Sequence, residues 1–402
     1  MAVYDKNRLI AEQSVSRATA PRKIGWIGRQ MTILPLWKLK REAGRLGLQL
    51  KSVAELITGP FARRRYDAQR MQAVQIADGV LPAGPKIVLF LLFQPKGIPD
   101  SVVQTCSYLA SKGYTPLVIS NAPLSKADRS VLCKTAWKVV ERPNYGYDFG
   151  GYRDGIWILN REGIVPDNLI IMNDSVWFPL GASEDLIDQM ETSQAAYLGA
   201  QVFGDSVAQA SDRKWRQPFF GSYFLMIKDT AFSHPDFQTY WTDYKLTSNK
   251  ETTLHRGERA FSYMMFKAGV QSEGIYSRDR FDSVVAALDK EDLPSALKYL
   301  ICMDPKLEQL RQHLLNTMTD SVDWTMACRD LIQASAETKN YIGSSPVLSI
   351  AKLNFPMIKK NNEMLYRRAR IAILQAISDG VLDGLNDSVQ DEIYEQTDMR
   401  GL

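Results

Sequence analysis

The chain has 402 residues, 45% of them hydrophobic and 23% charged, which is ordinary for a folded protein with one large domain and extensions, or with two domains. Its longest uninterrupted apolar run, residues 87–93, is too short to span a bilayer, and residues 1–15 lack the apolar core of a secretory signal. The four cysteines are scattered without the spacing of a zinc site, so we expect a reduced, cytoplasmic chain.

The net charge of +4 is divided unevenly along the chain. Residues 1–70 hold 15 Lys and Arg against 5 Asp and Glu, a balance of +10, and the remainder therefore carries −6. Trp26 and Trp37 lie among these cations. Two interpretations stay open. The segment can lie on an anionic membrane, here the inner face of the plasma membrane, or it can form a helix that packs on the main domain with a solvated basic face.

Apolar runs and helical patterns alternate from residue 86 onward. Strands are predicted at 86–93, 115–121, 135–144, 168–172, 195–203 and 270–277. Helices are predicted at 97–112, from Phe149, at 183–193 and 230–245, from Arg256 or Gly257 to Gly269, and at 364–377. Strands and helices at this spacing predict an α/β fold with a mostly parallel sheet flanked by helices.

The pattern also predicts how the chain is divided. Residues 1–84 form a basic, largely helical N-terminal extension, residues 85–290 the main domain, and residues 291–402 a helical C-terminal region. The tail from Asp379 is rich in acids and is predicted to be solvated or frayed.

Polar residues stand directly after a predicted buried strand, at Asn173-Asp174-Ser175. Ligands of open α/β sheets bind at the carboxyl ends of the strands, so these side chains are candidate site residues. Upstream, Asp148 is predicted to cap the next helix, whose first turn holds Gly150 and Gly151. Two glycines there indicate close approach, either by a phosphate or by packed backbone.

Several kinds of site are disfavoured by the absence of their motifs. The sequence has no GxxxxGK[ST], no GxGxxG after a strand, no GxSxG and no HExxH, and it has only three histidines. The basic excess lies outside the predicted sheet, so no nucleic-acid partner is expected.

Carboxylates and amides at strand ends remain, and they suit a diphosphate substrate held by Mg²⁺ or Mn²⁺. Asp174 is the candidate metal ligand, and Glu258 is a candidate general base for a hydroxyl acceptor. Alternatively, Glu258 is an ordinary acid at a helix N-terminus, favoured by the helix dipole.

These residues carry a family resemblance. Residues 142–155 (RPNYGYDFGGYRDG) and 173–181 (NDSVWFPLG), with Gly221-Ser-Tyr-Phe224 and the Glu258 helix further on, resemble the rhamnan synthesis protein F family over residues 85–280. The resemblance implies a bacterial glycosyltransferase of the GT-A type, with a Rossmann-like fold, that builds cell-surface polysaccharide from nucleotide-sugars.

The chain is also similar to GT-A enzymes in general. Asn144-x-Gly146 precedes a helix, and Asn173-Asp174-Ser175 stands in the place of their Asp-x-Asp, with one carboxylate where two are usual. Weaker metal binding is therefore expected, with Arg153, Arg142 or a helix N-terminus as alternatives for neutralising the diphosphate.

The resemblance implies a role for each candidate residue. Asp174 and Glu258 are the catalytic residues, and Asp174 is the ligand of a divalent metal. The nucleotide-sugar contacts are Asn144, Gly146, Asp148, Arg153, Asn173 and Ser175, and the sugar or acceptor contacts are Ser222 and Tyr223.

The partners implied are a nucleotide-diphosphate sugar, with rhamnose as one candidate sugar, and a glycan or lipid-linked glycan acceptor. The alternative function is a non-catalytic scaffold that binds sugar-nucleotide or polysaccharide machinery, and the single carboxylate at residues 173–175 favours it.

Overall fold

The computed structural model describes residues 58–181, 185–204, 217–338 and 340–397. Most of the predicted membrane segment, residues 1–57, lies outside the described residues. In the described part of the chain, no helix has the length and apolar character needed to cross a bilayer.

The strands are β1 (Gln75–Asp78), β2 (Lys86–Leu92), β3 (Thr115–Ser120), β4 (Lys138–Glu141), β5 (Asn168–Asn173), β6 (Val176–Trp177), β7 (Tyr197–Phe203), β8 (Phe219–Phe220), β9 (Phe224–Lys228), β10 (Ser272–Tyr276) and β11 (Ile358–Lys359). The first helix described runs through residues 58–73. The later helices are α2 (Asp100–Ser111), α3 (Lys126–Cys133), α4 (Tyr147–Arg161), α5 (Leu186–Thr192), α6 (Asp229–Phe232), α7 (Pro235–Asp243), α8 (Lys250–Leu254), the π-helical turn η3 (His255–Arg259), α9 (Ala260–Lys267), α10 (Arg278–Ala286), α11 (Leu293–Lys298), α12 (Pro305–Asn316), α13 (Val322–Thr338), α14 (Tyr341–Ser344), α15 (Pro346–Ala351), α16 (Met364–Ser378) and α17 (Asp387–Gln396).

One sheet organises the main domain. Its strands follow the order β1-β4-β3-β2-β5-β9-β7-β10, and β8 pairs with β7. The strands β4, β3, β2 and β5 are parallel, β9 is antiparallel to both of its neighbours, and β10 is parallel to β7. The predicted α/β fold with a mostly parallel sheet is confirmed.

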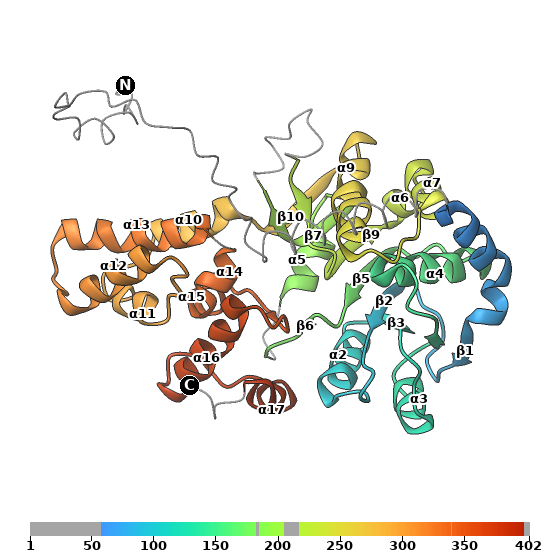
Figure 1. The fold of residues 1–402 in the computed structure, drawn as a ribbon, viewed down its shortest axis with the longest axis horizontal. Coiled ribbons are helices and arrows are strands. Elements are labelled where there is room, and N and C mark those ends of the chain that lie inside the picture. Colours follow the sequence, from blue (N-terminus) through green and yellow to red (C-terminus); the bar gives the residue numbers. More distant parts are fainter. Residues whose placement is uncertain (1–57, 182–184, 205–216, 339, 398–402) are drawn as a thin grey trace, which may run out of the picture. The chain divides into compact units, whose positions relative to one another are not determined.

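Both faces of the sheet are covered. On β2, Ile87, Leu89 and Leu91 belong to the core that α4, α7 and α9 complete, and the alternate residues belong to the core beneath α2, α3 and α5 (Figure 1). Side chains of a strand alternate between faces, so a strand covered on both sides is apolar throughout. This is why the strand pattern in the sequence is continuous.

The order of the strands creates a switch point between β2 and β5. The chain passes from β2 to β3 and β4 on one side, and α4 then returns it to β5 on the other side of β2. Ligands of such sheets bind where the direction of winding reverses, at the carboxyl ends of the strands. Phe93 and Asn173-Asp174-Ser175 lie at that point.

Helix α4 packs unusually close to β2 because of its glycines. A Cβ at Gly151 would lie 2.0 Å from Leu91 Cδ1, and a Cβ at Gly155 would lie 2.0 Å from Leu89 Cδ2. A Cβ at Gly150 would meet the backbone oxygen of Tyr145 at 2.2 Å. Groups of the protein itself therefore fill the space beside Gly150 and Gly151. These contacts favour close packing, and not a bound phosphate, as the reason for the two glycines.

The helix over residues 58–73 is held against α4 by buried ion pairs. Arg153 binds Asp67 through Nη1 to Oδ1 at 2.6 Å and Nη2 to Oδ2 at 2.9 Å, and its Nε donates to the oxygen of Trp241. The predicted phosphate contact of Arg153 is not supported, because its guanidinium is buried on the side of α4 that faces this helix. For residues 58–73, the interpretation as a packed helix therefore fits.

Arg142 is likewise used within the fold. Its guanidinium is buried and donates to Asp154 Oδ2, Asn121 Oδ1 and the oxygen of Tyr145, each at 2.6 Å. These bonds fix the loop that enters α4, so Arg142 does not serve as the expected alternative for neutralising a diphosphate.

The C-terminal region differs from the purely helical pattern expected of it. Strand β11 pairs antiparallel with β6, so that Lys359 lies opposite Val176. From Asp387 to Gln396 the acidic tail is not frayed, because α17 buries Val389 and Ile393, and Glu392 accepts hydrogen bonds from Trp177 Nε1 and from the N–H of Ser101. The apolar pair at i and i+4 and the polar contacts of Glu392 together dock this helix.

We predict that Arg153→Met lowers the free energy of unfolding by about 3 kcal/mol, because it leaves Asp67 in a partly buried site without its bidentate partner. Chemical denaturation measures this loss. In the folded fraction, binding of nucleoside diphosphates should stay within a few-fold of the parent chain. A large loss of nucleotide affinity with unchanged stability would contradict this prediction and would indicate that Arg153 contacts the phosphate.

Candidate active site

Asp174 joins the ends of the two strands at the switch point. Its N–H donates to the oxygen of Leu91 at 3.0 Å. Its Oδ2 accepts the N–H of Phe93 and the Nε2 of Gln94, each at 2.8 Å. Burial raises the pKa of Asp174, and the hydrogen bond from Phe93 and the charge of Lys360 oppose that rise. The carboxylate is thus held in one orientation between β2 and β5.

Asn173 connects the same turn to α4. Its Nδ2 donates to Asp148 Oδ2 at 3.0 Å, and its Oδ1 accepts the N–H of Ser175 at 3.1 Å and the hydroxyl of Ser175 at 2.6 Å. The predicted helix cap at Asp148 is wrong, because the N-cap is Gly146 and Asp148 turns toward Asn173 instead. Gly146 has a φ of 84°, in the left-handed region that suits glycine.

Asp148 is the most strongly perturbed acid of this group. Burial raises its pKa to about 6, and the negative charges of Asp174 and Glu258 contribute to the rise. Three acids distant in sequence therefore share one electrostatic environment. The structure places Asp148 and Glu258 near Asp174, the acid that the strand-end argument singled out.

Glu258 lies inside a helix and not at its start. The helix begins at Lys250, passes through the π-helical turn His255–Arg259, and continues to Lys267. The helix dipole therefore does not account for an acid at this position. A Cβ at Gly257 would lie 2.5 Å from Phe149 Cδ2, so the turn is pressed against α4. Such π-bulges are frequent at functional sites.

Ser222 holds the Glu258 carboxylate. Oε1 of Glu258 accepts the N–H of Ser222 at 2.7 Å and its hydroxyl at 2.8 Å. The oxygen of Ser222 in turn accepts the hydroxyl of Tyr152 at 2.9 Å. Oε2 of Glu258 has no hydrogen-bond partner among the residues that the structure describes, so it is the oxygen available to a substrate.

Tyr223 is buried next to the site. It is 2% exposed, and its hydroxyl donates to Gln201 Oε1 at 2.6 Å. The predicted contact of Tyr223 with a sugar is not supported, because its hydroxyl is buried in this bond. Its ring instead faces an ammonium group: Lys359 Nζ lies 3.4 Å from the ring centroid.

Lys359 is a residue that sequence reasoning missed. Burial lowers its pKa to about 8, and the charges of Glu258 and Asp148 act to raise it. Lys359 is the second residue of β11, opposite Val176, and the N–H of the next residue, Lys360, donates to the oxygen of Ser175 at 2.9 Å. The sole signal in the sequence was a short apolar run, residues 355–358, that ends in two lysines.

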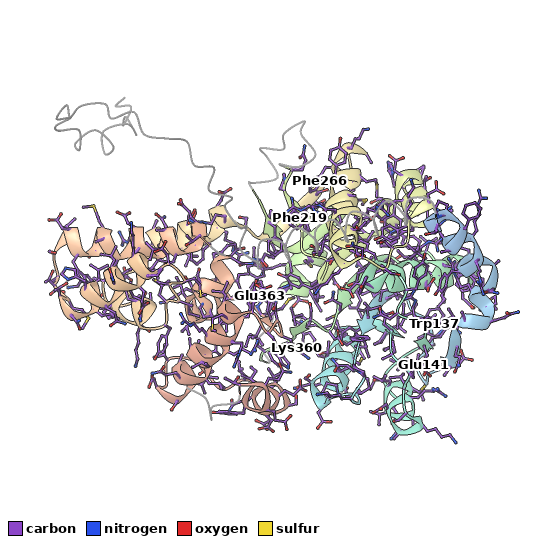
Figure 2. All side chains as sticks on the ribbon, in the orientation of Figure 1. Trp137, Glu141, Phe219, Phe266, Lys360 and Glu363 are labelled. Carbon is purple, nitrogen blue, oxygen red and sulfur yellow. The ribbon has the colours of Figure 1, made fainter. Side chains whose placement is uncertain are left out.

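Lys360 extends toward α17, and its charge also acts on Asp174. It forms an ion pair with Glu392 at 3.6 Å, and its Nζ lies 5.0 Å from the ring centroid of Trp177. Figure 2 labels Lys360 beside the paired strands β6 and β11.

Asn144, a predicted nucleotide contact, is exposed in the loop before α4, two residues before Gly146.

The donor set does not fit a divalent metal held by the protein. Asp174 Oδ2 and Asn173 Oδ1 each accept two hydrogen bonds, and Asp148 Oδ2 accepts one from Asn173. The ammonium of Lys359 stands near the acids that would have to supply further ligands. Across the described ranges, no three His, Cys, Asp or Glu side chains are grouped to bind a metal ion.

Two solved glycosyltransferases are similar in structure. Core-mannan synthase A of Aspergillus fumigatus, in its Mn/GDP form, has a TM-score of 0.30 and 10% identity, and the match covers 49% of this chain and 74% of that chain. The mannosyltransferase PcManGT of Pyrobaculum calidifontis, in complex with GDP-Man and Mn²⁺, has a TM-score of 0.27 and 8% identity, and the match covers 82% and 97%.

Sequence comparison is more informative. The chain is 27% identical over 356 residues to the uncharacterised protein y4gN of Sinorhizobium fredii, which covers 89% of this chain and 91% of that protein. The model of the family described as rhamnan synthesis protein F matches residues 117–373, more than half of the chain. The match includes the strand-end acids, the Glu258 helix and β11. The chain therefore belongs to the rhamnan synthesis protein F family and is a nucleotide-sugar-dependent glycosyltransferase.

Proposed function

We propose that this glycosyltransferase moves a sugar, with rhamnose as the first candidate, from a nucleoside diphosphate to a hydroxyl of a growing cell-surface glycan or lipid-linked glycan. The observation that carries the proposal is the meeting of Asp148, Asp174 and Glu258 beside the switch point. Family membership supports the sugar class, and the described geometry supports the position of the reaction.

The donor binds at the carboxyl ends of β2 and β5, where α/β sheets bind nucleotides. Asn144, Gly146 and Asp148 line the nucleotide, and Asn173-Asp174-Ser175 orient the diphosphate and the sugar. Asp174 suits this role because its carboxylate is fixed by Phe93 and Gln94. Ser222 acts by holding Glu258 and by facing the sugar.

Glu258 acts as the general base. As the acceptor hydroxyl attacks the anomeric carbon, its proton passes to Glu258 Oε2. The bond from the anomeric carbon to the phosphate oxygen breaks, and the electron pair leaves with the nucleoside diphosphate. The hydrogen bonds from Ser222 fix the other oxygen of Glu258, so the carboxylate presents one free oxygen to the acceptor.

We assign no step to a divalent metal. The sequence-based prediction of Mg²⁺ or Mn²⁺ at Asp174 rests on its Asp-x-Asp-like position, whereas Asp174 Oδ2 already accepts two hydrogen bonds there and the charge of Lys360 acts on the carboxylate.

A non-catalytic scaffold is the second candidate, and the single carboxylate at residues 173–175 favours it. The two functions differ in one simple measurement. An enzyme releases nucleoside diphosphate slowly from its donor in the absence of acceptor, and a scaffold releases none. A panel of nucleotide-sugars, each assayed with and without Mn²⁺, separates them and also identifies the nucleotide.

We predict that Glu258→Gln lowers kcat about 10²–10⁴-fold, as expected for the loss of a general base. Glutamine keeps an oxygen for Ser222, so the melting temperature should change little. Glu291→Gln, at an exposed position, is the matched control. Retention of activity within a few-fold would remove Glu258 from the reaction.

We predict that Asp174→Asn abolishes transfer and leaves the fold intact. An asparagine oxygen can still accept the N–H of Phe93, so only the charge at the strand end is lost. Transfer should fall by orders of magnitude while the melting temperature stays near that of the parent chain. Asp320→Asn, on an exposed acid, controls for the change of charge. Equal activity of the two variants would contradict a role for Asp174.

We further propose that the basic N-terminal residues bind anionic membrane, which would place the enzyme at the inner face of the plasma membrane beside lipid-linked acceptors. The support is the balance of +10 over residues 1–70 and the two tryptophans among the cations.

Liposome sedimentation tests this proposal. Removal of residues 1–57 keeps the helix that packs on α4 and keeps β1, so the main domain should fold. The full chain should sediment with anionic liposomes at low salt and be released at high salt, and the shortened chain should not sediment. Equal sedimentation of both chains would show that the N-terminal residues are not the membrane contact.

A further inference from the structure

Lys359 offers a positive charge to the candidate active site. Its Nζ packs on the face of Tyr223, and none of the described residues accepts a hydrogen bond from it. It is close enough to Glu258 and Asp148 for both charges to raise its pKa, and burial brings that pKa to about 8. The ammonium form therefore predominates at neutral pH, and its three protons remain available to a ligand.

The backbone around Lys359 is fixed by a strand pairing and by hydrogen bonds. Strand β11 pairs with β6, and the N–H of Lys360 donates to the oxygen of Ser175. Arg370, which is fully buried in α16, donates through Nη1 to the oxygen of Lys359 at 3.1 Å and to the oxygen of Asn361 at 2.8 Å. Arg370 is thus a positioning residue for Lys359.

The adjacent lysine serves a different purpose. Successive residues of a strand point to opposite sides, and Lys360 is paired with Glu392 of α17. Of this pair of lysines, Lys359 is the one whose charge acts on Asp148 and Glu258, whereas the charge of Lys360 acts on Asp174 and Glu392.

We infer that Lys359 binds the diphosphate of the donor and neutralises the leaving nucleoside diphosphate, the role that a divalent cation fills in metal-dependent enzymes of this chemistry. This inference rests on the proposed function. As the bond between the anomeric carbon and the phosphate oxygen breaks, the electron pair stays on that oxygen, and Lys359 donates a charge-assisted hydrogen bond to it. The acceptor proton goes to Glu258, so no further reactant is required.

The test is calorimetric binding to the full chain in excess EDTA. The probes are inorganic pyrophosphate, a panel of nucleoside diphosphates (UDP, GDP, dTDP and CDP) and the matching monophosphates. The variants are Lys359→Gln, Lys359→Arg and, as a matched control, Lys352→Gln, whose lysine is exposed and pairs with Asp292.

We expect the parent chain and Lys352→Gln to bind one nucleoside diphosphate in EDTA, and Lys359→Gln to bind it at least about tenfold more weakly, as for the loss of a charge-assisted hydrogen bond. Lys359→Arg should recover part of the affinity, and the matching monophosphate should be affected much less. Equal melting temperatures of the variants show that folding is not the cause.

Other results would overturn the inference in distinguishable ways. If Lys359→Gln and the parent chain bind the nucleotide equally, Lys359 does not bind the diphosphate, and the nucleotide site itself is unaffected. Binding that requires Mn²⁺ or Mg²⁺ assigns the charge to a metal. If pyrophosphate binds through Lys359 and none of the nucleotides binds, the anion site stands and the proposed nucleotide-sugar function fails. If no probe binds, both fail.

Discussion

Negative charge confined near the switch point is the constraint on which this site depends. Burial and the negative charges of Asp174 and Glu258 raise the pKa of Asp148, and burial raises the pKa of Asp174. Carboxylates in such a place stay charged only when donors or cations compensate them. Each acid accordingly has its own hydrogen-bond donors, and Lys359 supplies a nearby positive charge.

Rigid packing holds these groups in place. The close approach of α4 to β2 is possible because Gly151 and Gly155 have no side chain, and it fixes the first turn of α4, where Asp148 lies. On the other side of α4, the π-helical turn is pressed against Phe149 and presents Glu258 toward Ser222. Acids carried on packed helices and strand ends keep their geometry better than acids on loops.

The sheet could be predicted from the sequence because its strands are continuous apolar runs, a pattern that burial on both faces imposes. The position of Asp174 followed, since a polar residue directly after a buried strand lies at its carboxyl end; the contact of Asp148 with Asn173, in place of a helix cap, did not follow. The sequence did not predict on which side of a helix a given residue lies. Arg153 stands in the same helix as Asp148, yet it faces Asp67 on the N-terminal helix.

Lys359 escaped prediction for a different reason. Strand β11 has two residues, too few to show a period, and its partner β6 lies far away in the sequence. The docking of α17 was hidden in the same way, because its many acids outweigh the few apolar residues that it buries. Contacts with residues distant in sequence determine both the pairing of β11 and the docking of α17. The local sequence preferences of these segments do not indicate either.

The pairing of β6 with β11 also bears on how the protein is made. In a nascent chain, the acids of the site emerge well before Lys359. Until β11 arrives, the acids lack the ammonium that we infer holds the diphosphate. Donor binding would thus await the synthesis of β11, and a polypeptide terminated before Lys359 would leave the cell's pool of activated sugar untouched.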